Sequence, residues 1–318
     1  MKTEQLNKIQ FITFTAAAIL GVDILLVQQR IVALVGQDAW ISLLIGGLLT
    51  IIAGVAAFLL ATLYPDKDFP DIILEICGKF IGRIVLFVFS AYVLLYSGLS
   101  SRIFVQALKV FLVDRTPIYI LIAAYGVATT YADYKGVNTI GKIIDIILPI
   151  SITTIMAILL LAIPQADFVY IKPIFFENTE NVVKAILPSY TEFTGYNIIL
   201  YIYCHTKKTK GSFKFYLAGL LIPIFFYTAL TIVSIMVFGP NDLVTLIYPT
   251  LTLLKAIEFP ATFMERLESF AAIIWIGTAF LAAVISRYIT TSNLTVLFSI
   301  KDNHRKYVAL AVYPIVIF

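Results

Sequence analysis

The chain has 318 residues, of which 60% are hydrophobic and only 13% are charged, and its mean hydropathy is +0.96. Soluble proteins carry about 45–50% apolar and about 25% charged residues, so this composition excludes a soluble globular protein. A formal net charge of +4 leaves too little basic surface for a protein that binds nucleic acid. The composition therefore predicts a polytopic membrane protein, and its two cysteines do not suggest a disulfide framework.

Long apolar runs occur along the whole chain, and most are near the ~20 residues that a helix needs to cross the hydrocarbon core. They lie near 10–30, 39–63, 82–108, 117–132, 140–163, 184–204, 214–238 and 268–299. A ninth run begins near Tyr307 and reaches Phe318 without a polar flank, so we expect the C-terminal helices to be truncated here. The runs are too long and continuous for barrel strands and predict an all-α polytopic membrane protein.

Basic residues are distributed unevenly between the predicted loops. If the segments alternate from a cytoplasmic N-terminus, 14 Lys and Arg lie on the cytoplasmic side and 7 on the outer side. The positive-inside rule therefore favours a cytoplasmic N-terminus. The outer loop at 239–267 is too apolar to be fully solvated, so we expect a short helix there, delimited by Pro249 and Pro260.

The first apolar run carries an acidic residue near its middle. Asp23 follows Gly21 and Val22, and an aspartate near the bilayer centre costs about 2.5–3.5 kcal/mol to insert. Its side chain should therefore not face lipid. Because Gly21 lowers the cost of leaving helical geometry at the same place, the sequence predicts an interrupted helix around these residues.

The sixth run repeats this pattern with six residues that interrupt or polarise a helix: Pro188, Ser189, Thr191, Glu192, Thr194 and Gly195. Paired interruptions at matching positions mark the binding sites of inverted-repeat transporters. The freed N–H groups bind a carboxylate and the freed carbonyls accept from an ammonium, so the pattern indicates a site for a zwitterion. Packing kinks are the alternative explanation, since Gly and Pro are common in membrane helices.

With these interruptions located, the chain resembles the B subunit of spore germinant receptors, a branch of the amino acid–polyamine–organocation superfamily. The matching stretches, in chain order, are LGVDIL (20–25), QDAWIS (37–42), DRTPIY (114–119), KIIDIILPI (142–150), FTGYN (193–197), LIPI (221–224), IYPTL (247–251) and FPATFMERLESFAAIIW (259–275). The resemblance covers essentially the whole chain and implies a single transmembrane domain, 1–318, with a LeuT-like 5+5 inverted-repeat fold. The first repeat would span about 10–163, and an incomplete second repeat about 184–318.

The resemblance implies a ligand pocket between the broken first and sixth helices. It assigns Gly21 to the first interruption, Thr194 and Gly195 to the second, and two tyrosines to the pocket lining. Together with their neighbours, the expected ligand-binding residues are Gly21, Val22, Asp23, Tyr92, Glu192, Phe193, Thr194, Gly195 and Tyr288. Because two of these residues are acids, we expect the site to favour a cationic group unless one carboxyl is protonated.

The resemblance implies a nutrient-sensing subunit in the inner membrane of bacterial spores, with a germinant of about amino-acid size as its ligand. It also implies A-type and lipoprotein C-type subunits as partners. A secondary active transporter of an amino acid or small organic cation is the alternative, because fold alone does not separate sensing from transport. An enzyme is not expected, and neither is a metal or cofactor. The sequence shows no phosphate-binding Gly-rich loop, metal-ligand cluster or nucleophile beside a base.

Overall fold

The computed structural model describes residues 6–172, 179–206, 211–257, 261–301 and 304–317. Across these ranges the protein is helical, and no described residue belongs to a β-strand; Leu6 and Thr206 form an isolated bridge. The long helices are α3 (Ala39–Leu63), α4 (Phe69–Phe111), α5 (Ile118–Lys135), α6 (Val137–Ala162), α9 (Ser212–Phe238) and α12 (Ala261–Leu297). The shorter helices are α1 (Lys8–Ile19), α2 (Val27–Val35), α7 (Thr179–Thr191), α8 (Ile199–Ile202), α10 (Pro240–Thr245), α11 (Pro249–Ala256) and α13 (Arg305–Ile317). The prediction of an all-α protein is confirmed.

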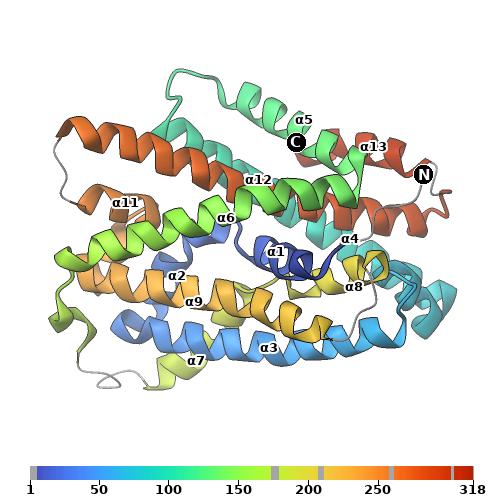
Figure 1. Ribbon diagram of the computed structural model, residues 1–318, viewed down its shortest axis with the longest axis horizontal. Coiled ribbons are helices and arrows are strands. Elements are labelled where there is room, and N and C mark those ends of the chain that lie inside the picture. The colour runs from blue at the N-terminus through green and yellow to red at the C-terminus, as the bar shows by residue number, and fades with distance from the viewer. Residues whose placement is uncertain (1–5, 173–178, 207–210, 258–260, 302–303, 318) are drawn as a thin grey trace.

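The helices are long and apolar enough to cross a membrane in four described stretches, judged by length and composition. These are Val27–Leu63, Val137–Gln165, Ser212–Phe238 and Trp275–Leu297. In Figure 1, α3, α6, α9 and α12 run along the long axis of the molecule. The shorter α1 lies against α6 and α9, and α2 lies against α7, α9 and α10.

Two of the predicted elements differ in extent from the structure. α4 begins at Phe69 rather than near residue 82, and its path turns at Gly78, where φ is 74° and ψ is 169°. The described part of the loop at 239–267 contains two short helices, α10 and α11, instead of one, and Pro249 begins the second. Pro opens a helix readily because the first N–H has no intrahelical partner. Pro260 lies outside the described residues.

Small residues allow the helices around the centre to approach closely. A Cβ on Gly46 of α3 would lie 2.7 Å from the backbone nitrogen of Tyr190 in α7. A Cβ on Gly219 of α9 would lie 2.8 Å from the Cβ of Thr15 in α1. Close backbone contact of this kind replaces the hydrophobic driving force that is missing between helices in lipid. These contacts fix the positions of α1, which ends at Ile19, and α7, which ends at Thr191.

A polar contact also holds α1 against α6. The carboxylate of Asp145 accepts hydrogen bonds of 2.9 Å from Gln10 Nε2 and of 2.9 Å from Thr13 Oγ1. Both donors lie on α1, so the first half of the interrupted helix is anchored before the chain reaches Gly21. Because its carboxylate is hydrogen-bonded within the protein, Asp145 avoids the cost of exposing an acid to lipid.

Candidate functional site

The first apolar run is interrupted where the sequence predicts. α1 ends at Ile19, Gly21 leads into a 3-10 turn over Val22–Leu25, and α2 continues from Val27. The end of α1 leaves carbonyl groups without helical partners, and the hydroxyl of Tyr227 donates to the carbonyl of Ile19 at 2.8 Å. Thr250 from α11 donates similarly to the carbonyl of Ile24 at 2.6 Å. The interruption is therefore a stabilised feature of the fold.

The sixth apolar run is interrupted as well. α7 ends at Thr191, residues 192–195 form turns, and a 3-10 turn over Tyr196–Ile198 precedes the single-turn helix α8. Pro188 lies inside α7, and the interruption begins only after Thr191. The hydroxyl of Thr191 donates to the carbonyl of Pro188 at 2.6 Å and satisfies one of the last carbonyls of the helix.

The two interruptions touch each other. Gly195 has φ of 130°, and a Cβ at this position would lie 2.5 Å from the carbonyl oxygen of Ala18. A side chain of any size would both strain this backbone and separate the two segments. Glycine at residue 195 is therefore the reason that the turn after α7 packs directly on the end of α1.

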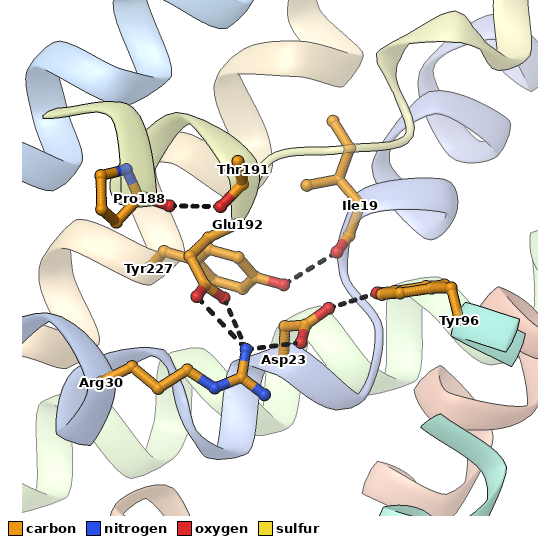
Figure 2. Close-up of polar contacts among 8 residues, drawn as sticks. All are labelled: Ile19, Asp23, Arg30, Tyr96, Pro188, Thr191, Glu192 and Tyr227. Carbon is orange, nitrogen blue, oxygen red and sulfur yellow. Dashed lines mark hydrogen bonds and ion pairs between the residues drawn. The ribbon is translucent and has the colours of Figure 1, made fainter. Parts of the chain in front are cut away.

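An ionic cluster joins the two interruptions (Figure 2). Nη1 of Arg30 lies 3.0 Å from Oδ1 of Asp23 and 3.2 Å from each carboxylate oxygen of Glu192. The other oxygen of Asp23 accepts a hydrogen bond from the hydroxyl of Tyr96 on α4. Asp23 and Arg30 come from the first run and Glu192 from the sixth, so one guanidinium contacts both sides of the junction.

The charges of this cluster do not cancel when all three side chains are ionised. Two carboxylates face one guanidinium, and Glu192 follows the carbonyl end of α7, where the helix dipole adds further negative potential. The side chains of Asp23 and Glu192 are only 13% and 8% exposed, whereas that of Arg30 is 39% exposed. Arg30 therefore covers two buried acids and is itself reachable from outside.

The structure brings most of the predicted site residues to this junction. Gly21, Val22 and Asp23 form the first interruption, and Glu192 to Gly195 form the second. Phe193 is fully buried, and its ring packs against that of Tyr227 at a centroid distance of 5.4 Å. Val22 is also buried. Both side chains belong to the hydrophobic core of the protein.

The two tyrosines assigned by resemblance lie elsewhere. Tyr92 is 53% exposed on α4 and stacks on Tyr96 at a centroid distance of 6.4 Å, so it is one helical turn from the residue that contacts Asp23. Tyr288 is buried, but its hydroxyl lies 3.2 Å from Nε2 of His205 and its ring lies under Arg305. It lines a separate polar cavity of 530 Å³. The structure thus places Tyr288, on α12, at this cavity and not beside the ionic cluster.

Sequence reasoning missed Arg30, Tyr96 and Tyr227 as parts of the junction. Arg30 is the first cation after Asp23 in the same apolar run, and acids inside membrane segments commonly pair with a cation. A signal for Arg30 was therefore available in the sequence. The contacts of Tyr96 and Tyr227 depend on tertiary packing and have no local signal. Among the described residues, no three His, Cys, Asp or Glu side chains are grouped closely enough to bind a metal ion.

These features define an all-α membrane protein with a buried polar junction at two helix interruptions. The chain belongs to the spore germination protein family, whose sequence profile matches residues 5–318. It is 27% identical to spore germination protein YndE of Bacillus subtilis (strain 168), covering 83% of this chain and 73% of that protein. It is 25% identical to spore germination protein A2 of the same organism, covering 93% and 81%. With spore germination protein B2 it shares 22% identity over 96% of this chain and 83% of the relative.

Proposed function

We propose that this protein is a nutrient-sensing subunit of a spore germination receptor and that a small molecule, such as an amino acid, binds between its two helix interruptions. The observation that carries the proposal is the contact of Arg30 with Asp23 and Glu192 at once. A ligand that competes for any of these charges changes how the first run is held against the sixth. A ligand that binds one arrangement of the two runs more tightly than another would thereby shift the equilibrium between these arrangements.

The charges favour a ligand with an ammonium group and a carboxylate. The excess carboxylate of the cluster suits a cation, and Arg30 offers a planar set of donors that matches a carboxylate. A zwitterion replaces both halves of the existing ion pairs, so neither buried acid is left without a partner. A ligand with only a carboxylate would leave the acids uncompensated and is disfavoured.

The junction is connected to the outer loop through hydrogen bonds. Nε2 of Gln28, a fully buried side chain of α2, donates to Oγ1 of Thr250 at 2.8 Å, and Thr250 in turn donates to Ile24. Gln29 donates to the carbonyl of Val244 on α10 at 3.0 Å. A movement of α2 at the site therefore moves α10 and α11. This route supports a sensor whose state is read by partner subunits.

The wider architecture belongs to the same proposal. Two inverted repeats, about 10–163 and 184–318, would place the two interruptions at matching positions, as in LeuT-like proteins. We propose a cytoplasmic N-terminus, a location in the spore inner membrane, and assembly with A-type and lipoprotein C-type subunits. The relatives named spore germination proteins A2 and B2 support this assignment.

A binding screen tests the proposal. Amino acids, amines, nucleosides and sugars are titrated against the purified wild type, Gly21→Leu and Glu192→Gln, with melting curves to verify folding. Glu180→Gln is the matched control, because Glu180 is an exposed acid of α7 that pairs with Lys184. We expect a ligand whose binding is lost in the two site variants and kept in the control. Equal binding to all four proteins would refute the site.

Liposome experiments separate sensing from the alternative of transport. Binding without accumulation of the labelled ligand in liposomes supports a sensor, and co-purification with A-type and C-type subunits adds independent support. Robust accumulation driven by an ion gradient would instead support a secondary active transporter, because the same site serves either function.

A further inference from the structure

A surface groove lies on α4, directly after its turn at Gly78. Its volume is 460 Å³, and it is lined by Lys79, Phe80, Arg83, Ile84 and Phe87. The two cations are one helical turn apart and so lie on the same face of the helix. None of the described residues that line the groove is an acid. The groove therefore combines a positive end with an apolar floor.

The position of the groove along α4 fits a membrane boundary. The next cation after Arg83 in the chain is Arg102, and residues 84–101 between them carry no charge. At 1.5 Å per residue this stretch is about 27 Å long, close to the thickness of the hydrocarbon core. Arg83 therefore lies where this uncharged stretch of α4 begins. Ile84 and Phe87 continue from it along the stretch.

The side chain of Arg83 is held in place by the end of another helix. Its Nη2 donates to Oγ of Ser299 at 3.0 Å, just after α12 ends. Ser299 has φ of 53° and is the one non-glycine residue with a positive φ among those that the structure describes. Such a conformation is uncommon for serine, and here it places the hydroxyl against the guanidinium. Among the described residues, this contact uses one of the five donors of Arg83 and orients the group.

We propose that this groove binds an anionic phospholipid. The phosphodiester contacts Lys79 and Arg83, and an acyl chain lies along Phe80, Ile84 and Phe87. The side chains of Phe80 and Phe87, at the two ends of the apolar floor, are 80% and 61% exposed, so the floor is open to an acyl chain from the bilayer. A free phosphate would use the cations but leave this floor uncovered. The site is independent of the junction at Arg30 and of the ligand proposed there.

Thermal melting in detergent, with lipid added, tests the proposal. Phosphatidylglycerol is compared with phosphatidylcholine and with inorganic phosphate, on wild type and on Lys79→Gln/Arg83→Gln. We expect phosphatidylglycerol to stabilise the wild type most, and its apparent affinity to fall about fivefold for each cation removed. The charge-conserving variant Lys79→Arg/Arg83→Lys should retain most of the effect. Lys172→Gln/Lys214→Gln, which removes two exposed cations outside the groove, should behave as the wild type does.

Three outcomes would overturn the proposal. One is equal stabilisation of the wild type and Lys79→Gln/Arg83→Gln by phosphatidylglycerol. Another is stabilisation by inorganic phosphate as large as that by the lipid, which would mean that the apolar floor has no part in binding. The third is an equal effect of phosphatidylcholine, which would mean that the charges have none. The remaining result, a preference for the anionic lipid that depends on both cations, supports it.

Discussion

Arg30 and Glu192 lie 162 positions apart in the chain, and Nη1 of Arg30 is 3.2 Å from both oxygens of the Glu192 carboxylate. This contact joins two helices that are each interrupted at the centre of the molecule. Asp23 contacts the same nitrogen at 3.0 Å. The side chain of Arg30 on α2 therefore connects to the first interruption through Asp23 and to the second through Glu192. The proposed ligand site depends on this arrangement.

Removing the guanidinium should weaken the junction measurably. Arg30→Gln leaves two buried acids without a cation, and we expect a loss of about 1–2 kcal/mol in stability, limited by the partial exposure of Arg30. The double variant Arg30→Gln/Glu192→Gln should recover part of this loss because one acid is also removed. Melting curves of the two single variants and the double variant give the coupling. Strict additivity of the two losses would contradict the contact.

Gly195 should tolerate no side chain, and Gly211 is the matched control that separates the steric clash from backbone strain. Gly195→Ala brings a Cβ to 2.5 Å from the carbonyl of Ala18 and strains a residue with φ of 130°, so we expect a loss of ~2 kcal/mol or more. Gly211 also has a positive φ, 92°, but a Cβ there meets no atom of the described residues within 4 Å. Gly211→Ala should therefore cost only the ~1 kcal/mol of backbone strain. Similar melting temperatures for the two variants would show that the interruptions do not pack together as described.

Tyr96 and Tyr92 should respond differently to loss of their hydroxyls. Tyr96→Phe removes the donor to Asp23, and we expect about 1 kcal/mol less stability together with an altered ligand affinity. Tyr92→Phe retains the ring that stacks on Tyr96 and removes only a hydroxyl from an exposed residue. It should match the wild type in both measurements. A larger effect from Tyr92→Phe would favour the assignment made by resemblance over the structure.

Asp68, which precedes α4 outside the apolar crossing, should make stability depend on pH. Burial, and then the negative charge of Asp71, raise the pKa of Asp68 to about 7. The protonated form is therefore favoured by the fold, and its contribution is fully present below the unfolded pKa of ~4. It is lost as the pH rises through 7. Melting curves from pH 5 to 8 should show this decline in the wild type and a flatter profile in Asp68→Asn.

A matched acid isolates the origin of that pH effect. Asp242 is exposed on α10 and is not among the described residues that line the polar cavity of Asp68. Asp242→Asn should keep the decline between pH 5 and 8. An identical pH profile in Asp68→Asn and the wild type would mean that another group produces the effect. His205 lines the same cavity, and burial together with the nearby charge of Arg305 lowers its pKa. The fold therefore favours the deprotonated form of His205, whereas it favours the protonated form of Asp68.

The positions of both interruptions followed from the sequence, while most contacts across them did not. Gly21 beside Asp23, and Glu192 beside Gly195, are local signals, because an acid or a flexible residue in an apolar run disfavours a lipid-facing helix. The contact between Arg30 and Glu192 depends on how two distant segments pack, and local patterns carry no information on it. The phase of a long helix is similarly hard to predict. The resemblance pointed to Tyr92, and the structure places Tyr96, one turn further on, at Asp23.

The most direct measurement is a structure of the protein with the ligand from the binding screen bound. If the proposed site is correct, the ligand lies within hydrogen-bonding distance of Arg30 or of Glu192, and at least one of the present ion pairs is exchanged for a contact to the ligand. Density at another place, with Arg30 still bonded to both Asp23 and Glu192 as in the free protein, would contradict it.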